Sequence, residues 1–320
     1  MFIGGEEKGK LMRADSHLHV NFRDHSAEKI IAYLDSQNLD SAWLLTWEEY
    51  RPIIPSEYQH LPVADVYEAY RRYPSRLIPM YAPDPTRPGF RELLRSWHGK
   101  GIRGIGELKV SCSWESHAIG ALLQEARALK LPVIFHMEGP GYFPFPKRWQ
   151  NRIFNNTLNR NNLIGRRLGR RLGSLTGYFP GYLPDFAGLG KRLAEFPEVT
   201  FIGHGPLFWK GIAREQGNAL FPGGRVGEPG ILCSLLSEHP NLIADLSGRS
   251  GYNALSRDPA FGRRFLTENS RRILFGTDNY DLGLPWLLDS LGLDPADLGR
   301  IMGGNADSII PAGNSQAPWN

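Results

Sequence analysis

Short apolar runs alternate with segments of helical periodicity along most of the chain. An apolar run of roughly four to eight residues between turn residues is typical of a buried strand, whereas apolar positions every three or four residues predict one face of a helix. Such runs alternate with helical segments as expected for parallel strands joined by helices. The predicted strands cover about residues 12–19, 41–46, 76–82, 102–108, 131–136, 199–204, 242–246 and 272–277.

Serine residues mark the start of two predicted helices. Ser26 precedes a segment in which Ile30, Ile31 and Leu34 share one face, and Ser116 precedes another with apolar residues at helical spacing. A serine here caps a helix because its hydroxyl accepts a hydrogen bond from the first turn. Further helices are predicted over about residues 63–70, 90–97, 286–291 and 297–302.

The alternation predicts a single α/β domain over residues 1–320, a (β/α)8 TIM barrel. Two connections are too long for plain barrel loops: about 139–190 after the fifth strand and 205–230 after the sixth. Both leave from the C-terminal ends of strands. We therefore expect them to cover the mouth of the barrel as lids.

The first of these connections is strongly basic. Its eight cations against one acid, Asp185, give a local charge of +7, so the remaining residues sum to −3 within the net charge of +4. A funnel for an anionic substrate is one interpretation, and a solvated face or a subunit contact is another. Nucleic-acid binding is not expected, because aromatic residues for base stacking are few. The cations are Lys147, Arg148, Arg152, Arg160, Arg166, Arg167, Arg170 and Arg171.

The composition adds limits on location. The chain is 41% apolar, which suits a sizeable core, but it has no apolar run long enough for a transmembrane helix and no signal-peptide pattern at its start. Cys112 and Cys233 are too few for a disulfide framework, so a reducing compartment, the cytoplasm, is expected. Membrane association is not expected, and homo-oligomer formation stays open.

Metal-competent side chains lie at the ends of the predicted strands. His17 and His19 alternate on the first strand, His136 and His204 end the fifth and sixth, and Asp278 closes the eighth. The C-terminal ends of barrel strands meet at one rim, so these groups are expected to converge. Mixed nitrogen and oxygen donors suit Zn²⁺ first, with Mn²⁺, Fe²⁺ or Co²⁺ as alternatives.

Strand alternation gives two further expectations. Asp15 should point the same way as the two histidines of the first strand. Glu107 should share a face with Ile105, so it would join the site as a further ligand if Ile105 points into the barrel. The alternative for Glu107 is an ion pair, for example with Lys109.

The combined motifs resemble the amidohydrolase superfamily. The likeness is strongest to its amidohydrolase-related branch, which also contains decarboxylases of the aminocarboxymuconate-semialdehyde type. It covers roughly residues 11–310. The resemblance implies the TIM-barrel fold, one or two divalent metal ions, and Glu107 as a bridging ligand in some branches. The motifs that carry it are Asp15-Ser-His-Leu-His19, Phe135-His136, Gly203-His204-Gly205 and Phe275-Gly-Thr-Asp278, with local support from residues 104–107, 245–253 and 303–306.

Roles for individual residues follow from the metal and from the resemblance. Asp278 would accept a proton from a metal-bound water and return it to the leaving group. His204 would orient or polarise the bound substrate, as the resemblance implies. Arg249 could hold a substrate carboxylate through its planar fork, and Tyr252 and Trp209 could line the pocket. The alternative for these three residues is a packing or loop-stabilising role.

The function predicted from the sequence is hydrolysis of an amide, lactone or ester in a small anionic substrate by a metal-dependent enzyme. The alternative within enzymes is metal-dependent, non-oxidative decarboxylation. Some decarboxylases of the branch replace the first histidine of the His-x-His motif by glutamate, so His17 favours hydrolysis. The alternative of another class is a non-catalytic barrel that binds a small molecule, since a fold alone does not establish activity.

Overall fold

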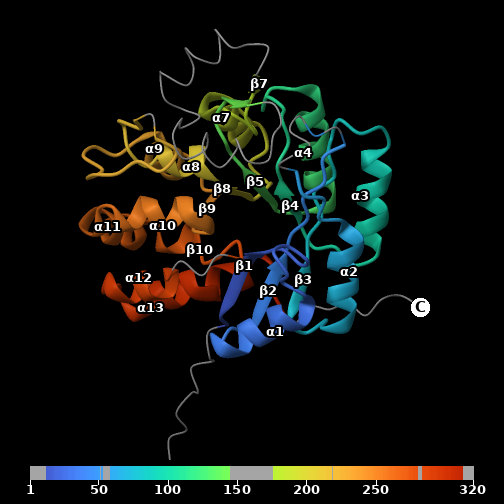
Figure 1. Ribbon diagram of the computed structural model, residues 1–320, viewed down its shortest axis with the longest axis horizontal. Helices are drawn as coiled ribbons and strands as arrows, with labels where there is room; N and C mark the ends of the chain where they lie inside the picture. The colour runs from blue at the N-terminus through green and yellow to red at the C-terminus, as the bar shows by residue number, and fades with distance from the viewer. Residues whose placement is uncertain are drawn as a thin grey trace, which may run out of the picture.

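The computed structural model describes residues 12–50, 52, 58–144, 176–217, 219–279 and 283–312. Eight parallel strands surround the centre of the molecule, and helices lie outside them (Figure 1). One sheet has the order β1-β2-β3, and a second has the order β10-β9-β8-β5-β4. The strands are β1 (Ala14–Leu18), β2 (Ser41–Leu44), β3 (Leu77–Pro79), β4 (Ile105–Leu108), β5 (Val133–His136), β8 (Phe201–His204), β9 (Leu242–Asp245) and β10 (Ile273–Leu274).

Backbone hydrogen bonds close the two sheets into a barrel. Between β3 and β4, the Tyr81 N–H donates to the Gly104 carbonyl at 3.0 Å. Between β10 and β1, the Ser16 N–H donates to the Phe275 carbonyl at 2.9 Å. The predicted barrel of eight parallel strands is therefore confirmed.

Helices follow the strands as the apolar pattern predicts. The Ser26 and Ser116 hydroxyls accept hydrogen bonds from the backbone of Lys29 and Ile119, so both predicted caps are confirmed. The helices are α1 (Ala27–Ser36), α2 (Val63–Arg72), α3 (Phe90–Gly99), α4 (His117–Leu129), α7 (Phe186–Glu195), α8 (Pro206–Lys210), α9 (Ile231–Glu238), α10 (Gly248–Ser256), α11 (Pro259–Asn269), α12 (Leu284–Ser290), α13 (Pro295–Gly299), the π-helix η2 (Arg300–Gly304) and α14 (Asn305–Ile309), with a short 3-10 turn, η1 (Ser270–Arg272), before β10.

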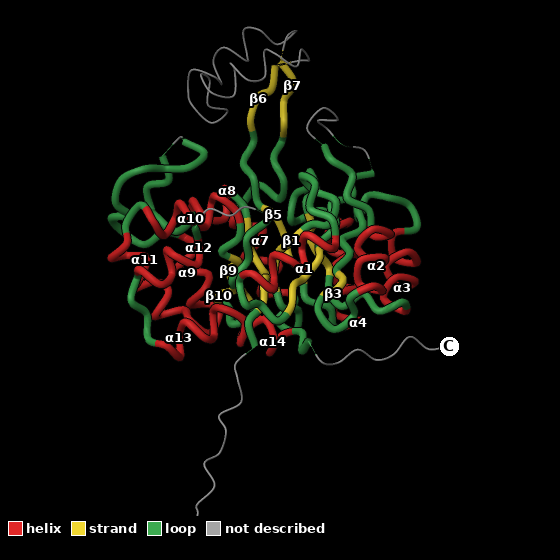
Figure 2. The backbone as a smooth tube through the Cα atoms, turned by 60° about the horizontal axis from the view of Figure 1, so that its bottom comes forward, coloured by secondary structure: helices red, strands yellow, loops and turns green. Residues whose placement is uncertain are grey.

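Two apolar layers hold the barrel together. The larger lies between strands and helices, and the smaller fills the barrel interior with residues such as Trp43, Met80 and Ile202. A glycine on β4 makes room for this interior layer. A Cβ at Gly104 would lie 2.1 Å from the Met80 methyl group, so a side chain at Gly104 would displace Met80. Helix α14 contributes Ala306 to the same layer and closes the lower end of the barrel (Figure 2).

A two-stranded ribbon rises from the C-terminal rim of the barrel (Figure 2). It consists of β6 (Gly141–Pro144) and β7 (Thr176–Phe179), which pair antiparallel. At its base Glu138 and Tyr182 exchange two backbone hydrogen bonds. The first long connection, predicted over about residues 139–190, contains this ribbon and ends where Asp185 caps α7. The expected boundary at residue 190 is therefore wrong by one helical turn or more. The eight predicted basic residues lie outside the described part of the chain.

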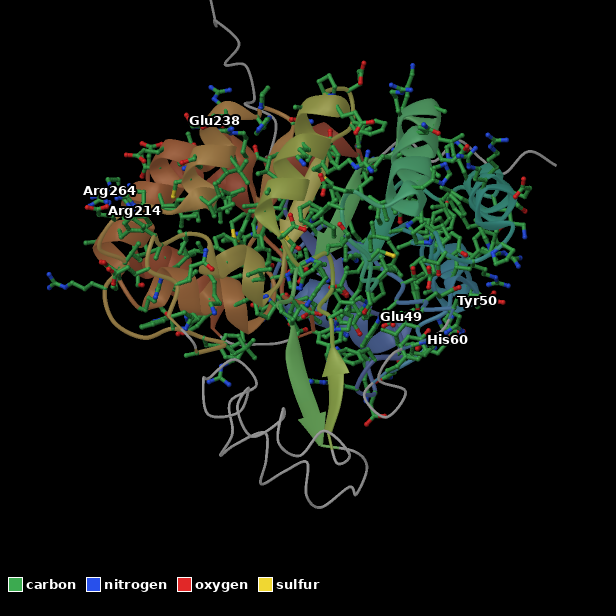
Figure 3. The ribbon with its side chains drawn as sticks, turned by 90° about the horizontal axis from the view of Figure 1, so that it is seen from above. Glu49, Tyr50, His60, Arg214, Glu238 and Arg264 are labelled. Carbon is green, nitrogen blue, oxygen red and sulfur yellow. The ribbon has the colours of Figure 1, made fainter. Side chains whose placement is uncertain are left out.

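The second long connection begins with α8 and ends where α9 starts. Ala213 and Pro229 pair across it in an isolated antiparallel bridge. In the view from above, Arg214 and Arg264 lie on one side of the barrel and Glu49 lies on the other side (Figure 3). No helix within the described ranges combines the length and the apolar character that crossing a membrane requires.

Candidate metal centre

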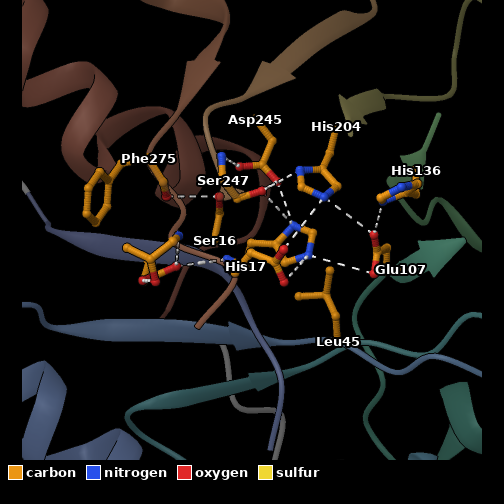
Figure 4. Close-up of polar contacts among 12 residues, drawn as sticks. Ser16, His17, Leu45, Glu107, His136, His204, Asp245, Ser247 and Phe275 are labelled. Carbon is orange, nitrogen blue, oxygen red and sulfur yellow. Dashed lines mark hydrogen bonds and ion pairs between the residues drawn. The ribbon is translucent and has the colours of Figure 1, made fainter. Parts of the chain in front are cut away.

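Histidine and carboxylate side chains come together at the C-terminal ends of the barrel strands (Figure 4). This is where barrels of parallel strands gather active-site groups. Two groups of three among the described residues could hold a metal ion. One consists of His17, His19 and Asp278, and the other of His17, Glu107 and His204.

His17 belongs to both groups and is fully buried. Its Nδ1 lies 2.6 Å from Asp245 Oδ2, so the imidazole donates the Nδ1 proton to that carboxylate. Its buried Nε2 has no hydrogen-bond partner among the described residues. Such an atom is rare, and a carboxylate that fixes one imidazole nitrogen is typical of metal-binding histidines. The structure therefore leaves His17 Nε2 available as a ligand atom.

His19 is oriented by the backbone of the neighbouring strand. Its Nδ1 donates to the Leu45 carbonyl oxygen at 2.9 Å, which leaves Nε2 with a lone pair. That nitrogen lies 3.4 Å from Asp278 Oδ1 and 3.6 Å from Glu107 Oε2. His17 Nε2 lies 3.8 Å and 4.0 Å from the same two oxygens. Two nitrogens and two carboxylate oxygens are thus grouped together.

The nitrogen–oxygen spacings are compatible with a single divalent cation. Ligands about 2.0 to 2.2 Å from a zinc ion in tetrahedral geometry lie roughly 3.3 to 3.6 Å from one another. The nitrogen–oxygen separations of 3.4, 3.6, 3.8 and 4.0 Å are close to that range. The donor set is also acceptable to manganese, iron or cobalt.

The local electrostatics favour a positive charge. Burial disfavours protonation of His17, but Asp245, Asp278 and Glu107 outweigh it and raise the pKa of His17 to about 9. Burial also opposes ionisation of Asp278, but the neighbouring His19 and the charge of His17 lower the pKa of this carboxyl. The carboxylates around His17 therefore stabilise a cation.

Glu107 reaches the centre by a route that alternation does not predict. Ile105 packs in the layer between strands and helices, yet Glu107 turns inward. The pairing of β4 with β5 shifts register between Ile105 and Leu108, and such an irregularity breaks alternation. The expectation that Glu107 reaches the site only if Ile105 points into the barrel is therefore wrong. Burial opposes ionisation of Glu107, but Lys109 and His136 hold the pKa of this carboxyl well below its usual range.

His136 lies beside the cluster with both nitrogens directed at carboxylates. Its Nδ1 donates to Glu107 Oε1 at 2.7 Å, and its Nε2 lies 3.5 Å from Glu138 Oε2. Neither metal-competent group within the described residues includes it. Because β4 and β5 are neighbours, the structure places this predicted ligand against Glu107, where it orients that carboxylate.

Ser247 fixes the orientation of His204. Its Oγ donates to Asp245 Oδ2 at 2.8 Å and lies 2.7 Å from His204 Nδ1. A hydroxyl has one proton, so His204 Nδ1 is the donor in the second bond and Nε2 keeps its lone pair. This Nε2 lies 3.5 Å from Glu107 Oε1 and 4.0 Å from Asp278 Oδ2. Burial lowers the pKa of His204 to about 3, so the ring is neutral at neutral pH.

The segment after β10 presents Asp278 to the centre. Its backbone N–H donates to the His17 carbonyl at 2.8 Å, and its φ of 55° lies in the left-handed region that aspartate and asparagine tolerate. Asn279 then clamps His19 by accepting from its N–H at 2.8 Å and donating to its carbonyl at 2.7 Å. With 19% of its side chain exposed, Asp278 is the most accessible member of the two metal-competent groups.

Asp15 does not share the face of the two histidines on β1. Its carboxylate accepts hydrogen bonds from Thr277 Oγ1 at 2.6 Å and from the Tyr33 hydroxyl at 3.0 Å. The pairing of β1 with β2 shifts register between Asp15 and Leu18, so the expected alternation is wrong here. Burial raises the pKa of Asp15 to about 6, although these donors oppose the rise. Asp15 ties β1 to the segment that carries Asp278.

The three predicted substrate contacts lie around the donors rather than against them. Trp209 is buried and donates from Nε1 to the Asp245 carbonyl at 2.9 Å. Arg249 is exposed, and its guanidinium lies 4.7 Å from the centre of the Phe221 ring. Tyr252 packs against the outer apolar layer. In the described part of the chain, no hydrogen bond or ion pair joins these side chains to the metal-competent groups.

Three residues that the sequence did not single out complete the centre. Ser247 joins two site histidines, and Asn279 holds the backbone of His19. Gly276 leaves space, because a Cβ there would lie 2.7 Å from Asp245 Oδ1 and 2.9 Å from the His17 Cβ. Ser247 and Gly276 lie within motifs that carry the family resemblance, whereas Asn279 gave no sequence signal.

Solved structures share this fold. A Pseudomonas putida protein provisionally described as a 2-pyrone-4,6-dicarboxylic acid hydrolase superposes with a TM-score of 0.58 at 14% identity, over 95% of this chain and 98% of that chain. 5-Carboxyvanillate decarboxylase from Sphingomonas paucimobilis superposes with a TM-score of 0.51 at 12% identity, over 93% of this chain and 98% of that chain. 2,6-Dihydroxybenzoate decarboxylase from Rhizobium superposes with a TM-score of 0.51 at 13% identity, over 93% of this chain and 98% of that chain.

Sequence comparison gives the family. A search of curated proteins finds no significant match. A family model described as amidohydrolase matches residues 58–310, well over half of the chain. The motifs at the strand ends and the barrel agree with this match. The protein therefore belongs to the amidohydrolase family of enzymes.

Proposed function

We propose that this protein is a metal-dependent hydrolase that cleaves an amide, lactone or other ester bond in a small anionic substrate. The observation that carries the proposal is the position of His17 and His19 Nε2 beside Glu107 Oε2 and Asp278 Oδ1, with nitrogen–oxygen separations of 3.4 to 4.0 Å. Zinc is the ion that this donor set suits best. When bound, such an ion would supply an activated water and polarise the scissile carbonyl.

Asp278 is the residue proposed to move the proton. Its Oδ1 faces the two histidines of β1, whereas Oδ2 lies on the side of His204. A lowered pKa keeps it ionised at neutral pH, so it can accept a proton and return it to the leaving group. Its partial exposure gives this carboxylate access to substrate.

His204 would act through the lone pair of Nε2. Ser247 Oγ accepts a hydrogen bond from His204 Nδ1, so Nε2 of the neutral ring presents an acceptor toward Glu107 and Asp278. This nitrogen can receive a hydrogen bond or serve as a further ligand. The polarising role expected for His204 would need a proton on Nε2, which the bond to Ser247 does not favour.

The donor arrangement favours one ion through His17. An imidazole nitrogen has a single lone pair, so the two metal-competent groups cannot both use His17 Nε2 at once. A second ion would depend on Glu107 Oε1, Asp278 Oδ2 and His204 Nε2, and the bond from His136 already engages that Glu107 oxygen. We therefore expect one equivalent of metal per chain.

Metal content tests the proposal. Protein purified without chelator would be analysed by plasma mass spectrometry, together with His17→Ala and Glu107→Ala. A matched control is His98→Ala, because His98 is a half-buried histidine bonded to the Ile102 carbonyl in another part of the chain. About one equivalent in the wild type and the control, lost in His17→Ala, supports the centre. Absence of metal after reconstitution contradicts it, and near two equivalents that fall to one in Glu107→Ala would make Glu107 a bridge.

A substrate panel then separates the reactions. Solved structures of this fold include proteins named for a lactone dicarboxylate and for two aromatic acids, which supports a substrate with a carboxylate. The panel would contain 2-pyrone-4,6-dicarboxylate, 5-carboxyvanillate and 2,6-dihydroxybenzoate. Ring opening supports hydrolysis, and release of carbon dioxide supports the decarboxylase alternative. Binding without turnover by metal-loaded protein would favour the non-catalytic barrel.

A further inference from the structure

Lys109 places a positive charge beside the metal centre, where it helps to keep Glu107 ionised. It follows directly after β4 and is half-buried. Its ammonium lies 3.9 Å from the centre of the Trp47 ring and 5.6 Å from the centre of the Tyr182 ring. Among the described residues it forms no hydrogen bond and no ion pair. A half-buried ammonium loses water, and aromatic faces replace only part of that stabilisation.

The aromatic corner around Lys109 is fixed by one carboxylate. Glu49 Oε1 accepts a hydrogen bond from Trp47 Nε1 at 2.9 Å and another from the Tyr182 hydroxyl at 2.9 Å. The two rings stand at 89° to each other with centres 6.5 Å apart. Such a preformed corner limits the positions of the ammonium, which reduces the entropy lost when an anion binds.

This corner adjoins the metal centre. Lys109 follows Glu107 by two residues, so their Cα atoms lie within about 7 Å of each other. The Tyr182 ring stands at 88° to the ring of His136, with centres 6.0 Å apart, and His136 bonds to Glu107. A small molecule at the donors could therefore reach the ammonium.

Lys109 is better placed than Arg249 to bind a substrate anion. Arg249 is exposed and lies over Phe221. The ammonium of Lys109 has three N–H donors, and no described acceptor takes any of them. A carboxylate would supply the acceptors that these donors lack, together with a negative charge at hydrogen-bonding distance.

We propose that Lys109, held by Trp47 and Tyr182, anchors a carboxylate of the substrate. This inference rests on the proposed function, because the reacting bond is placed at the metal centre. It narrows the substrate to a small organic acid in which the carboxylate and the reacting group are different parts of one molecule. Lys109 would then determine specificity for acids over neutral analogues.

Binding of a matched pair of ligands tests the anchor. Benzene-1,3-dicarboxylate and the neutral benzene-1,3-dicarboxamide would be titrated into chelator-treated protein by calorimetry. The variants are Lys109→Met, which removes the charge, and Lys109→Arg, which keeps it. Lys100→Met is the matched control, because the Lys100 ammonium also lies over a tryptophan, 4.1 Å from the centre of the Trp97 ring at the end of α3.

We expect Lys109→Met to weaken binding of the dicarboxylate at least about tenfold, since a charge-assisted hydrogen bond is lost. Lys109→Arg should retain most of the affinity, and Lys100→Met all of it. The diamide should be insensitive to Lys109→Met. Equal loss for both ligands, unchanged affinity in Lys109→Met, or no binding by the wild type up to about 10 mM dicarboxylate would each overturn the anchor.

The two proposals fail separately. Binding is measured on metal-free protein, whereas the metal centre is tested by metal content. Normal metal content together with acid binding that does not depend on Lys109 would contradict the anchor and leave the metal centre supported. Should Lys109→Met not fold, Lys109→Gln, which also removes the charge, takes its place in the comparison of acid with diamide.

Discussion

His17 Nδ1 and Asp245 Oδ2 lie 2.6 Å apart, and neither residue is exposed. The pair joins β1 to β9 and directs His17 Nε2 toward Glu107 and Asp278. A carboxylate that accepts a hydrogen bond from the other imidazole nitrogen also makes the ligand nitrogen more basic. The metal affinity of the centre should therefore depend on Asp245, a residue that does not contact the ion.

Replacing Asp245 with asparagine tests this dependence. Asp245→Asn keeps the shape but removes the charge, so we expect a 10- to 100-fold loss of metal affinity, roughly the effect of removing such a partner. Zinc affinity would be measured by competition with a coloured chelator. Asp289→Asn, at an exposed position of α12, is the control. Equal affinities of Asp245→Asn and the wild type would rule out the supporting role.

Ser247→Ala should destabilise the fold. The hydroxyl bonds to Asp245 and His204 and lies 3.1 Å from His17 Nδ1, so its removal leaves the buried His204 Nδ1 without an acceptor. An unsatisfied buried donor costs roughly 1 to 3 kcal/mol. Urea unfolding would measure the loss, with Ser234→Ala on the exposed side of α9 as the control. A variant as stable as the control would mean that another group accepts the His204 proton.

Gly276→Ala should disturb the same contact from the other side. The added methyl would lie 2.7 Å from Asp245 Oδ1 and 2.9 Å from the His17 Cβ, and both groups are buried. Overpacking of this kind typically costs about 1 to 3 kcal/mol. Gly99→Ala is the control, since a Cβ there meets no atom within 4 Å. Thermal unfolding midpoints should fall for Gly276→Ala alone, and similar midpoints for both variants would contradict the crowding.

Glu49 should give the stability a specific pH dependence. Burial raises the pKa of Glu49, although donors from Tyr182 and Trp47 oppose the rise. The folded protein then keeps this proton to a higher pH than the unfolded chain. The contribution of Glu49 to the free energy of unfolding therefore falls as the pH rises from the ordinary glutamate pKa through the raised value.

Glu49→Gln isolates this effect, because the amide oxygen can accept the same two hydrogen bonds without a charge. Urea midpoints measured from pH 4 to 7 should show the wild type losing stability relative to Glu49→Gln as the pH rises. Glu68→Gln, on the exposed side of α2, should track the wild type across the range. A constant difference between wild type and Glu49→Gln would show that the carboxyl is not shifted in this direction.

The barrel was predictable because its strands and helices follow from local patterns. Each barrel strand coincides with an apolar run, and the serine caps at Ser26 and Ser116 follow from their own hydroxyls. Side-chain direction at the strand ends was not predictable. The irregular pairings near Asp15 and Glu107 depend on neighbouring strands, which a pattern of period two does not contain.

The histidines were found because strand ends in a barrel converge, but their partners were not. His136 is separated from Glu107 by a helix in sequence, and only the β4–β5 contact shows that the two side chains bond to each other. Ser247 and Asn279 look like ordinary loop residues in the sequence. Their importance comes from hydrogen bonds to residues near the other end of the chain.

The seam between β10 and β1 has a consequence for how the protein is made. His17 and His19 are synthesised well before Asp278, yet all three form one metal-competent group. A growing chain on the ribosome cannot assemble that group until β10 has emerged and paired with β1. Tight uptake of metal should therefore follow the emergence of β10, and products that stop before β10 should lack this group of ligands.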